Sequence, residues 1–204
     1  EIQLIGDIEK KISYKFKDKN LLSTALTHSS YAGRFNKKSN ERLEFIGDGF
    51  LDAVIGFDLF VRLTDNSEGT LSKRRAQIVC SESLAEIGLK LGIDKEFLLG
   101  NGEELNRGRC NKHIIADAVE AIIGAVYIDG GYEEAKGLIL ELFEDTIDRA
   151  VSGQLNFDYK SRLQELVQKK YGSTPIRYTV VSESGPEHCK SFSVQVEIND
   201  KIFG

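Results

Sequence analysis

The chain has 204 residues, of which 41% are hydrophobic and 29% are charged, and its formal net charge is −5. This length and composition are typical of one medium domain, or of a domain with a small additional module. No apolar run reaches the roughly 18 residues that a membrane helix requires, so we expect no membrane span. The negative net charge argues against a protein that binds nucleic acid over its whole surface.

Residues 1–150 have apolar side chains at spacings of three and four residues, which predicts an all-helical domain. The ranges that fit this spacing are 2–12, 20–26, 40–62, 68–79, 81–91, 114–128 and 132–150. Residues 151–157 are mostly polar and include Gly153, so we expect a linker there.

Residues 158–204 have a different pattern, which predicts a small α+β module. A helix at 159–171 precedes two alternating runs, 176–184 and 190–198, which are rich in β-branched residues and read as strands. The segment GPEHC between them reads as a turn, and a third short run follows at 201–204. The predicted fold class is therefore mainly α, with a helical domain followed by this small module.

The three cysteines, Cys80, Cys110 and Cys189, lie far apart and show no CxxC spacing. We therefore expect neither a disulfide framework nor a thiolate zinc site. A reducing compartment, the cytoplasm, is the expected location.

The segment NERLEFIGDGFLD, residues 40–52, places acids within an otherwise apolar helix. Glu41, Glu44 and Asp48 fall within about 60° of one another around that helix and form one stripe. Apolar residues cover most of the remaining circumference, so the helix is expected to be buried on nearly all sides. The acids are expected to share that burial.

A second helix, IIADAVEAIIGAVYI at residues 114–128, repeats the arrangement, because Asp117 and Glu120 are its only charged residues. Ionised carboxylates in apolar surroundings repel one another and are costly unless they pair with a cation or bind a metal. Salt bridges from Arg42, Arg74 or Arg75 at a solvated edge are one explanation.

Metal binding is the other explanation that the residues leave open. A di-iron helix bundle normally uses Glu-x-x-His pairs, and neither acidic helix contains His. Five carboxylates exceed what one or two arginines would match, and carboxylate oxygens without His or Cys favour Mg²⁺, with Mn²⁺ as the substitute. Such a metal most often serves phosphoryl chemistry, so phosphodiester hydrolysis is the leading reaction class.

The segment NERLEFIGDGFLD closely resembles the signature of the ribonuclease III family, NERLEFLGDxxL. The segments ALTHSSY, EGTLSKRRAQIV and IIADAVEAIIGAVYIDGG agree with the family in the same order. DYKSRLQELVQ and GPEHCKSFSVQV resemble the double-stranded RNA-binding domain that follows in the bacterial enzymes. The resemblance implies a magnesium-dependent endoribonuclease that cuts double-stranded RNA during rRNA and mRNA processing, leaving 5′-phosphate and 3′-hydroxyl ends.

All six acidic residues of the family's site are present. The residues that the resemblance implies as direct metal ligands are Glu44, Asp117 and Glu120. The residues that it implies as holding metal-bound waters or shaping the site are Glu41, Asp48 and Glu68. Asp48 and Glu120 are the pair to which it assigns catalysis.

Family members work as homodimers, and the resemblance implies that Phe45 packs into the partner subunit; otherwise Phe45 is an ordinary core aromatic. The RNA-binding module is implied to contact the minor groove of a duplex, where 2′-hydroxyls and phosphates are accessible. The residues implied in that contact are Ser161, Gln164, Glu165, Gln168 and His188. Without the resemblance, these residues are typical of an exposed polar face.

The module departs from the family pattern at its end, because family members continue into a second helix whose basic start meets phosphates, whereas this chain ends at Gly204. Residues 156–204 contain seven Lys and Arg against six Asp and Glu, so we expect the module to lack that helix here and to bind duplexes weakly. His28 is expected to cap or hydrogen-bond locally, and His113 to lie on the surface.

Two other functions stay open. A homologue could hold double-stranded RNA without cutting it, although the complete set of acids favours the enzyme. An unrelated helical metal phosphohydrolase would ignore duplexes. The basic run Lys73, Arg74 and Arg75 could face either RNA phosphate or solvent.

Overall fold

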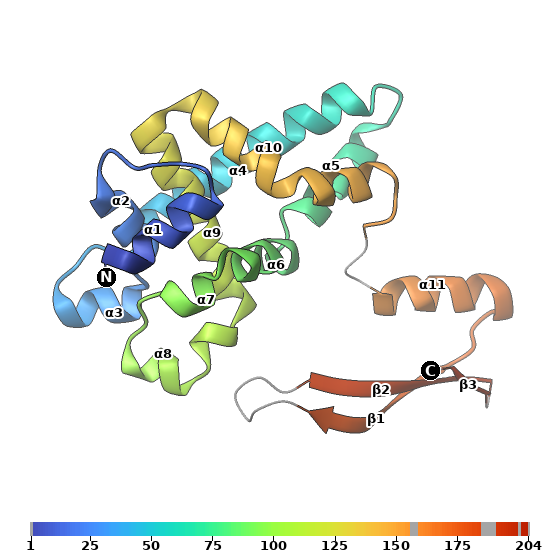
Figure 1. The fold of residues 1–204 in the computed structure, drawn as a ribbon. Helices are drawn as coiled ribbons and strands as arrows, with labels where there is room; N and C mark the ends of the chain where they lie inside the picture. Colours follow the sequence, from blue (N-terminus) through green and yellow to red (C-terminus); the bar gives the residue numbers. More distant parts are fainter. Residues whose placement is uncertain (1, 156–158, 185–190, 200, 204) are drawn as a thin grey trace. The chain divides into compact units, whose positions relative to one another are not determined.

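The computed structural model describes residues 2–155, 159–184, 191–199 and 201–203. The chain divides into two compact units, Glu1–Leu155 and Asn156–Gly204. The first unit is built from helices, and the second combines one helix with an antiparallel sheet (Figure 1). This architecture confirms the predicted fold class.

Each helix that apolar spacing predicts in the first unit is present, with ends within two residues of the expected ones. The helices of this unit are α1 (Ile2–Lys11), α2 (Lys19–Ala25), α3 (Ser29–Phe35), α4 (Glu41–Arg62), α5 (Glu68–Ile78), α6 (Ser81–Leu91), α7 (Ile93–Glu96), α8 (Asn101–Leu105), η1 (Gly108–Cys110), α9 (Lys112–Gly130) and α10 (Tyr132–Val151). The sequence did not predict α3, α7, α8 or η1, because so short a helix completes too few turns for apolar periodicity to show. Among the described residues, none of the helices combines the length and apolar character that crossing a bilayer requires.

Helix α9 is the central helix of this unit and is buried along most of its length. Helix α4 packs directly against it, as Figure 1 shows. A methyl group at Gly47 of α4 would lie 1.9 Å from the carbonyl oxygen of Glu120, and one at Gly124 of α9 would lie 2.1 Å from that of Leu43. Only glycine therefore permits this crossing, and the crossing brings the two acidic segments side by side.

The first unit extends a few residues beyond the last helix. The backbone N–H of Leu155 donates to the carbonyl oxygen of Arg149 at 2.9 Å, and the Leu155 side chain is buried. Gly153 adopts a positive φ of 77°, a conformation that glycine reaches without strain. The chain thus turns back at Gly153 and closes the end of the helical unit with Leu155.

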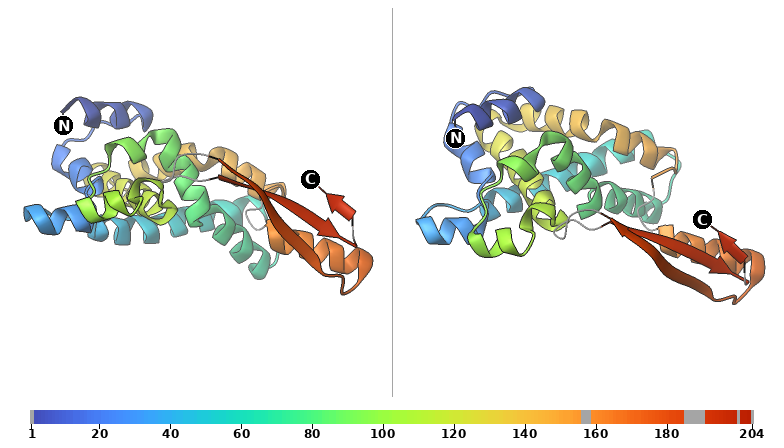
Figure 2. Two further views of the ribbon diagram at one scale, coloured as in Figure 1. Left: turned by 90° about the horizontal axis from the view of Figure 1, so that it is seen from below. Right: turned by 60° about the horizontal axis from the view of Figure 1, so that its bottom comes forward.

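The second unit contains α11 (Tyr159–Tyr171), β1 (Ile176–Ser184), β2 (Ser191–Ile198) and β3 (Lys201–Phe203). The strands are antiparallel in the order β1-β2-β3, and α11 lies against the sheet (Figure 2). Val167 of α11 and Ile198 of β2 are buried, whereas Phe192 and Ile202 are exposed. Among the described residues of this unit, the core is therefore small. The predicted turn GPEHC lies outside the described residues.

Cys80 carries a free thiol, and its Sγ donates to the carbonyl oxygen of Gln77 at 3.3 Å. Cys189 lies outside the described residues. The expectation about disulfides therefore stays a prediction, as does the cytoplasm.

Candidate metal centre

Three carboxylates from the two central helices converge on one point. One oxygen each from Glu44 on α4 and from Asp117 and Glu120 on α9 lie within 4.8 Å of one another. All three side chains are partly buried. Glu44 stands nearly one turn before Gly47, and the Glu120 carbonyl is the atom that Gly47 contacts, so the glycine crossing sets this convergence.

The electrostatics of the cluster show an excess of negative charge. Burial, followed by repulsion from Asp48, Asp117 and Glu44, raises the pKa of Glu120 to about 8. Burial, followed by the charges of Asp117, Glu41 and Asp48, also raises the pKa of Glu44. Burial raises the pKa of Asp117 as well. A divalent cation between these oxygens would remove the repulsion and restore the ionised forms.

Two histidines stand beside Asp117, and their protonated forms would lower its pKa against the effect of burial. His113 lies one turn before Asp117 on α9 and is exposed, as the sequence predicted. His28 caps α3, because its Nδ1 accepts from the backbone N–H of Ser30 at 3.2 Å. The sequence predicted this local role, but it contained no signal that His28 stands near Asp117.

The supporting acids differ in how close they come to the cluster. Asp48 contributes the largest of the charges that raise the pKa of Glu120, and Glu41 acts on Glu44. Glu68, the first residue of α5, instead accepts a hydrogen bond from the Ser72 hydroxyl at 2.7 Å. It is not among the acids whose charge raises the pKa of any of the three converging carboxylates.

Asp52 lies near the cluster and was not predicted from the sequence as a residue of the site. Its charge is among those that raise the pKa of Glu120. The available signal was its position four residues after Asp48, which continues the acidic stripe by one turn of α4.

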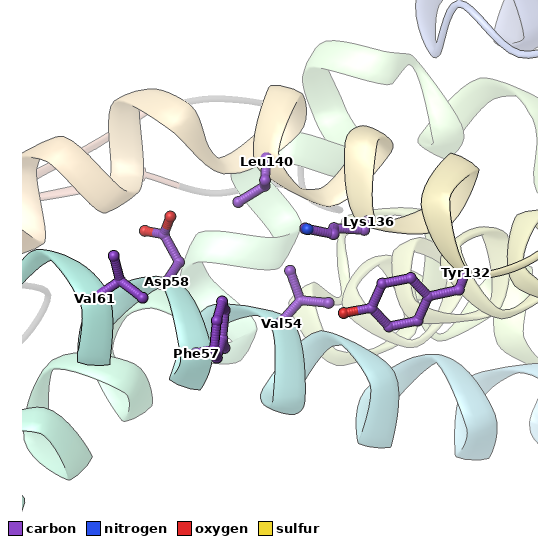
Figure 3. Close-up of a pocket in the computed structure, with 7 residues that line it drawn as sticks. All are labelled: Val54, Phe57, Asp58, Val61, Tyr132, Lys136 and Leu140. Atoms are coloured by element: carbon purple, nitrogen blue, oxygen red, sulfur yellow. The ribbon is translucent and has the colours of Figure 1, made fainter.

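Phe45 projects from α4 with 80% of its surface exposed, so it is not the core aromatic that the sequence left open. Phe57 and Phe60 of the same helix are also largely exposed. A shallow groove beside them lies between α4 and α10, where Phe57 and Val61 face Lys136 and Leu140 (Figure 3). This groove is lined by other residues than the carboxylates, and it marks an apolar surface of α4.

The residues expected to contact RNA lie in the second unit. Gln164, Glu165 and Gln168 are exposed on α11. Ser161 belongs to the same helix, and its side chain lies outside the described part of the structure. His188 lies outside the described residues. The role of these residues in RNA binding stays a prediction.

Comparisons with known proteins agree with this arrangement along the chain. Residues 18–146 match the family model described as Ribonuclease-III-like, and residues 159–204 match the double-stranded RNA binding motif. The protein named Ribonuclease 3 from Caldanaerobacter subterraneus subsp. tengcongensis is 48% identical over 97% of this chain and 87% of its own length. That of Clostridium acetobutylicum is 45% identical over 99% of this chain and 88% of its own length.

A solved structure is similar in fold to the helical unit. It is the nuclease domain of ribonuclease III from Campylobacter jejuni, described as structurally flexible in a region involved in dimer formation. It has a TM-score of 0.66 and 44% identity, and the match covers 69% of this chain and 96% of that one. With a matching family model over most of the chain and relatives of this identity, the chain belongs to the ribonuclease III family.

Proposed function

We propose that this protein is an endoribonuclease that hydrolyses phosphodiester bonds of double-stranded RNA and leaves 5′-phosphate and 3′-hydroxyl ends. The observation that carries the proposal is the convergence of Glu44, Asp117 and Glu120 with an excess of negative charge. Its place in the ribonuclease III family and the double-stranded RNA binding motif at 159–204 support the same substrate. Processing of rRNA and mRNA in the cytoplasm is the cellular role that we propose.

The donor set of the cluster fits Mg²⁺, with Mn²⁺ as the substitute. Glu44, Asp117 and Glu120 offer only carboxylate oxygens, which are the ligands that hard divalent cations prefer. The bound metal would supply an activated water and neutralise charge on the phosphate and the leaving oxygen. We place Asp48 and Glu120 next to the chemistry, whereas Glu41 and Glu68 would orient waters from farther away.

The exposed face of α4 supports a homodimer. Phe45, Gly49, Ala53, Phe57 and Phe60 follow one another at spacings of four, four, four and three residues, and all five are exposed. The space around Gly49 is open, so a second helix can approach this face closely. We therefore propose that Phe45 contacts the partner subunit, as the family resemblance implies.

The two domains that the sequence predicts have different proposed roles. We propose a nuclease domain at 1–150, a linker at 151–157 whose part up to Leu155 packs on the helical unit, and a double-stranded RNA-binding domain at 158–204. In the second unit, Gln164, Glu165 and Gln168 on the exposed face of α11, together with Ser161 of the same helix, would meet the minor groove, where shape and 2′-hydroxyls are recognised. His188 would join this contact.

The test is cleavage of an end-labelled RNA duplex by the full chain. We expect cleavage with Mg²⁺, none with Ca²⁺, and a loss of about 10³-fold or more in Glu120→Gln. Glu86→Gln is the matched control, because Glu86 is an exposed acid on α6. Binding of the duplex without any cleavage in Mg²⁺ would instead establish the non-cleaving homologue.

A further inference from the structure

The three consecutive basic residues of α5 point in different directions. The guanidinium of Arg74 donates to the carbonyl oxygen of Ala150. Lys73 is exposed, and its place two residues before Arg75 puts it about 200° away around the helix. Arg75 reaches α4, where its Nε lies 3.7 Å from Oδ1 of Asp52. Of these three, Arg75 is therefore the side chain that the structure joins to the acidic stripe.

The contact with Asp52 places Arg75 at the edge of the carboxylate cluster. Asp52 stands one turn of α4 beyond Asp48, and its charge reaches Glu120. The pair is open to solvent, since the side chains of Arg75 and Asp52 are 43% and 40% exposed. A ligand in solution can therefore reach the guanidinium.

Arg75 lies over Gly56 on the surface of α4. A methyl group at Gly56 would lie 3.7 Å from Cδ and 3.8 Å from Nη1 of Arg75, which is ordinary van der Waals contact. The stem of Arg75 thus lies across the glycine. The approach to Asp52 through Nε leaves the terminal N–H groups of the guanidinium for another acceptor.

A phosphate is the acceptor that this geometry suits. The planar guanidinium matches phosphate oxygens with two parallel hydrogen bonds, and it stays charged at any physiological pH. The residues of the cluster are acidic and repel an RNA backbone. An RNA backbone that approaches them therefore needs a second cation in addition to the metal. Arg75 provides a fixed cation one turn beyond Asp48.

We propose that Arg75 binds the RNA phosphate next to the one being cleaved, and that Asp52 orients its guanidinium for this contact. The proposal rests on the proposed function and names a further group that touches the substrate. A purely structural Arg75 would only tie α5 to α4 through Asp52.

The experiment measures duplex RNA binding by the full chain in Ca²⁺ over a series of KCl concentrations. Arg75→Gln is expected to weaken binding about tenfold and to lower the slope of log K against log[KCl] by about 1, as loss of one phosphate contact predicts. Arg75→Lys keeps the charge and should retain the slope while losing part of the affinity. Lys73→Gln removes one charge from the same helix and serves as the control. It should lower the affinity and the salt slope by less than half as much as Arg75→Gln does.

Thermal unfolding separates the two roles of Arg75. If Arg75→Gln and Asp52→Asn lower the Tm equally while the affinity and the salt slope stay at the values of the unaltered protein, Arg75 is structural and the proposal is overturned. A variant that binds weakly with an unchanged Tm supports it. Failure of the unaltered protein to cleave in Mg²⁺ would refute the proposed nuclease, whereas the salt series would still decide whether Arg75 meets phosphate.

Discussion

At the scale of single residues, the acids of the site are not equivalent. Glu44, Asp117 and Glu120 share one point, whereas Asp48 and Glu41 act on it only through their charge. Glu68 is held by Ser72 at the start of another helix. The resemblance separates three implied metal ligands from three supporting acids, and in the structure the three implied ligands are the ones whose oxygens converge.

This distinction between the acids predicts different losses of activity. Glu44→Gln removes a carboxylate from the converging group and should lower cleavage in saturating Mg²⁺ by about 100-fold or more. Glu68→Gln should cost less than about tenfold, because Glu68 acts on the cluster weakly. Initial rates on a labelled duplex measure both. Equal losses in the two variants would show that Glu68 belongs to the same group.

The pKa of Glu120 predicts how the metal-free protein responds to pH. In the folded state the pKa of Glu120 is raised to about 8 from an ordinary 4.5. Between pH 4.5 and about pH 8 the folded protein therefore keeps a proton on Glu120 that the unfolded protein has released. Stability in EDTA should therefore fall as pH rises from about 4.5 to about 8. Urea unfolding across this range measures the trend. Glu120→Gln should flatten it, and an unchanged slope in this variant would contradict the assignment.

At the scale of elements, the site depends on how closely two helices cross. The glycines at 47 and 124 let the backbones of α4 and α9 touch, and the carboxylates on either side of that contact then face one another. A third glycine, Gly88, brings α6 against α9, since a methyl group there would lie 2.4 Å from Cγ2 of Ile115. Small residues thus place α9 at the centre.

Substitution of Gly47 tests this dependence. Gly47→Ala forces a methyl group against the Glu120 carbonyl and should destabilise the fold by about 1–3 kcal/mol, and it should also weaken Mg²⁺ binding. Gly137→Ala is the matched control, because Gly137 lies within α10 with open space around it. That change should stabilise the helix by about 0.5–1 kcal/mol. Urea unfolding of both variants gives the comparison, and equal stability would refute the crossing argument.

At the scale of the whole molecule, each unit leaves an apolar surface exposed. In the helical unit this is the α4 face around Phe45 and Phe57, and in the second unit it includes Phe192 and Ile202 on the sheet. Exposed apolar surface of this kind marks a contact with another chain or segment. For α4, a second copy of the chain is the proposed occupant.

The dimer proposal predicts a change of mass in solution. Phe45→Ala should weaken self-association by about 30-fold, which is the loss typical of a buried aromatic anchor. Sedimentation equilibrium at several concentrations measures this. Phe35→Ala is the control, because Phe35 is a half-exposed aromatic on α3, away from the α4 stripe. A monomeric unaltered protein, or equal association of both variants, would contradict the proposal.

The sequence by itself determined the helical pattern, the two acidic segments and the family, because each is written in local spacing or in a contiguous motif. The spacing of residues along one helix is enough to place Glu44 beside Glu41 and Asp48, whichever other helices pack against it. The sequence also predicted the strands β1 and β2 of the second unit from their alternating runs of β-branched residues.

Only the tertiary structure decided which of these residues meet. The place of Asp52 and Arg75 and the exposure of Phe45 depend on contacts between segments far apart in the chain. So does the convergence of Glu44 with Asp117 and Glu120, which the family resemblance implied but helical spacing could not. Helical periodicity sets the direction of a side chain around its own axis but carries no information about the depth and angle at which another helix crosses. Here that crossing is set by Gly47 and Gly124, two residues without side chains.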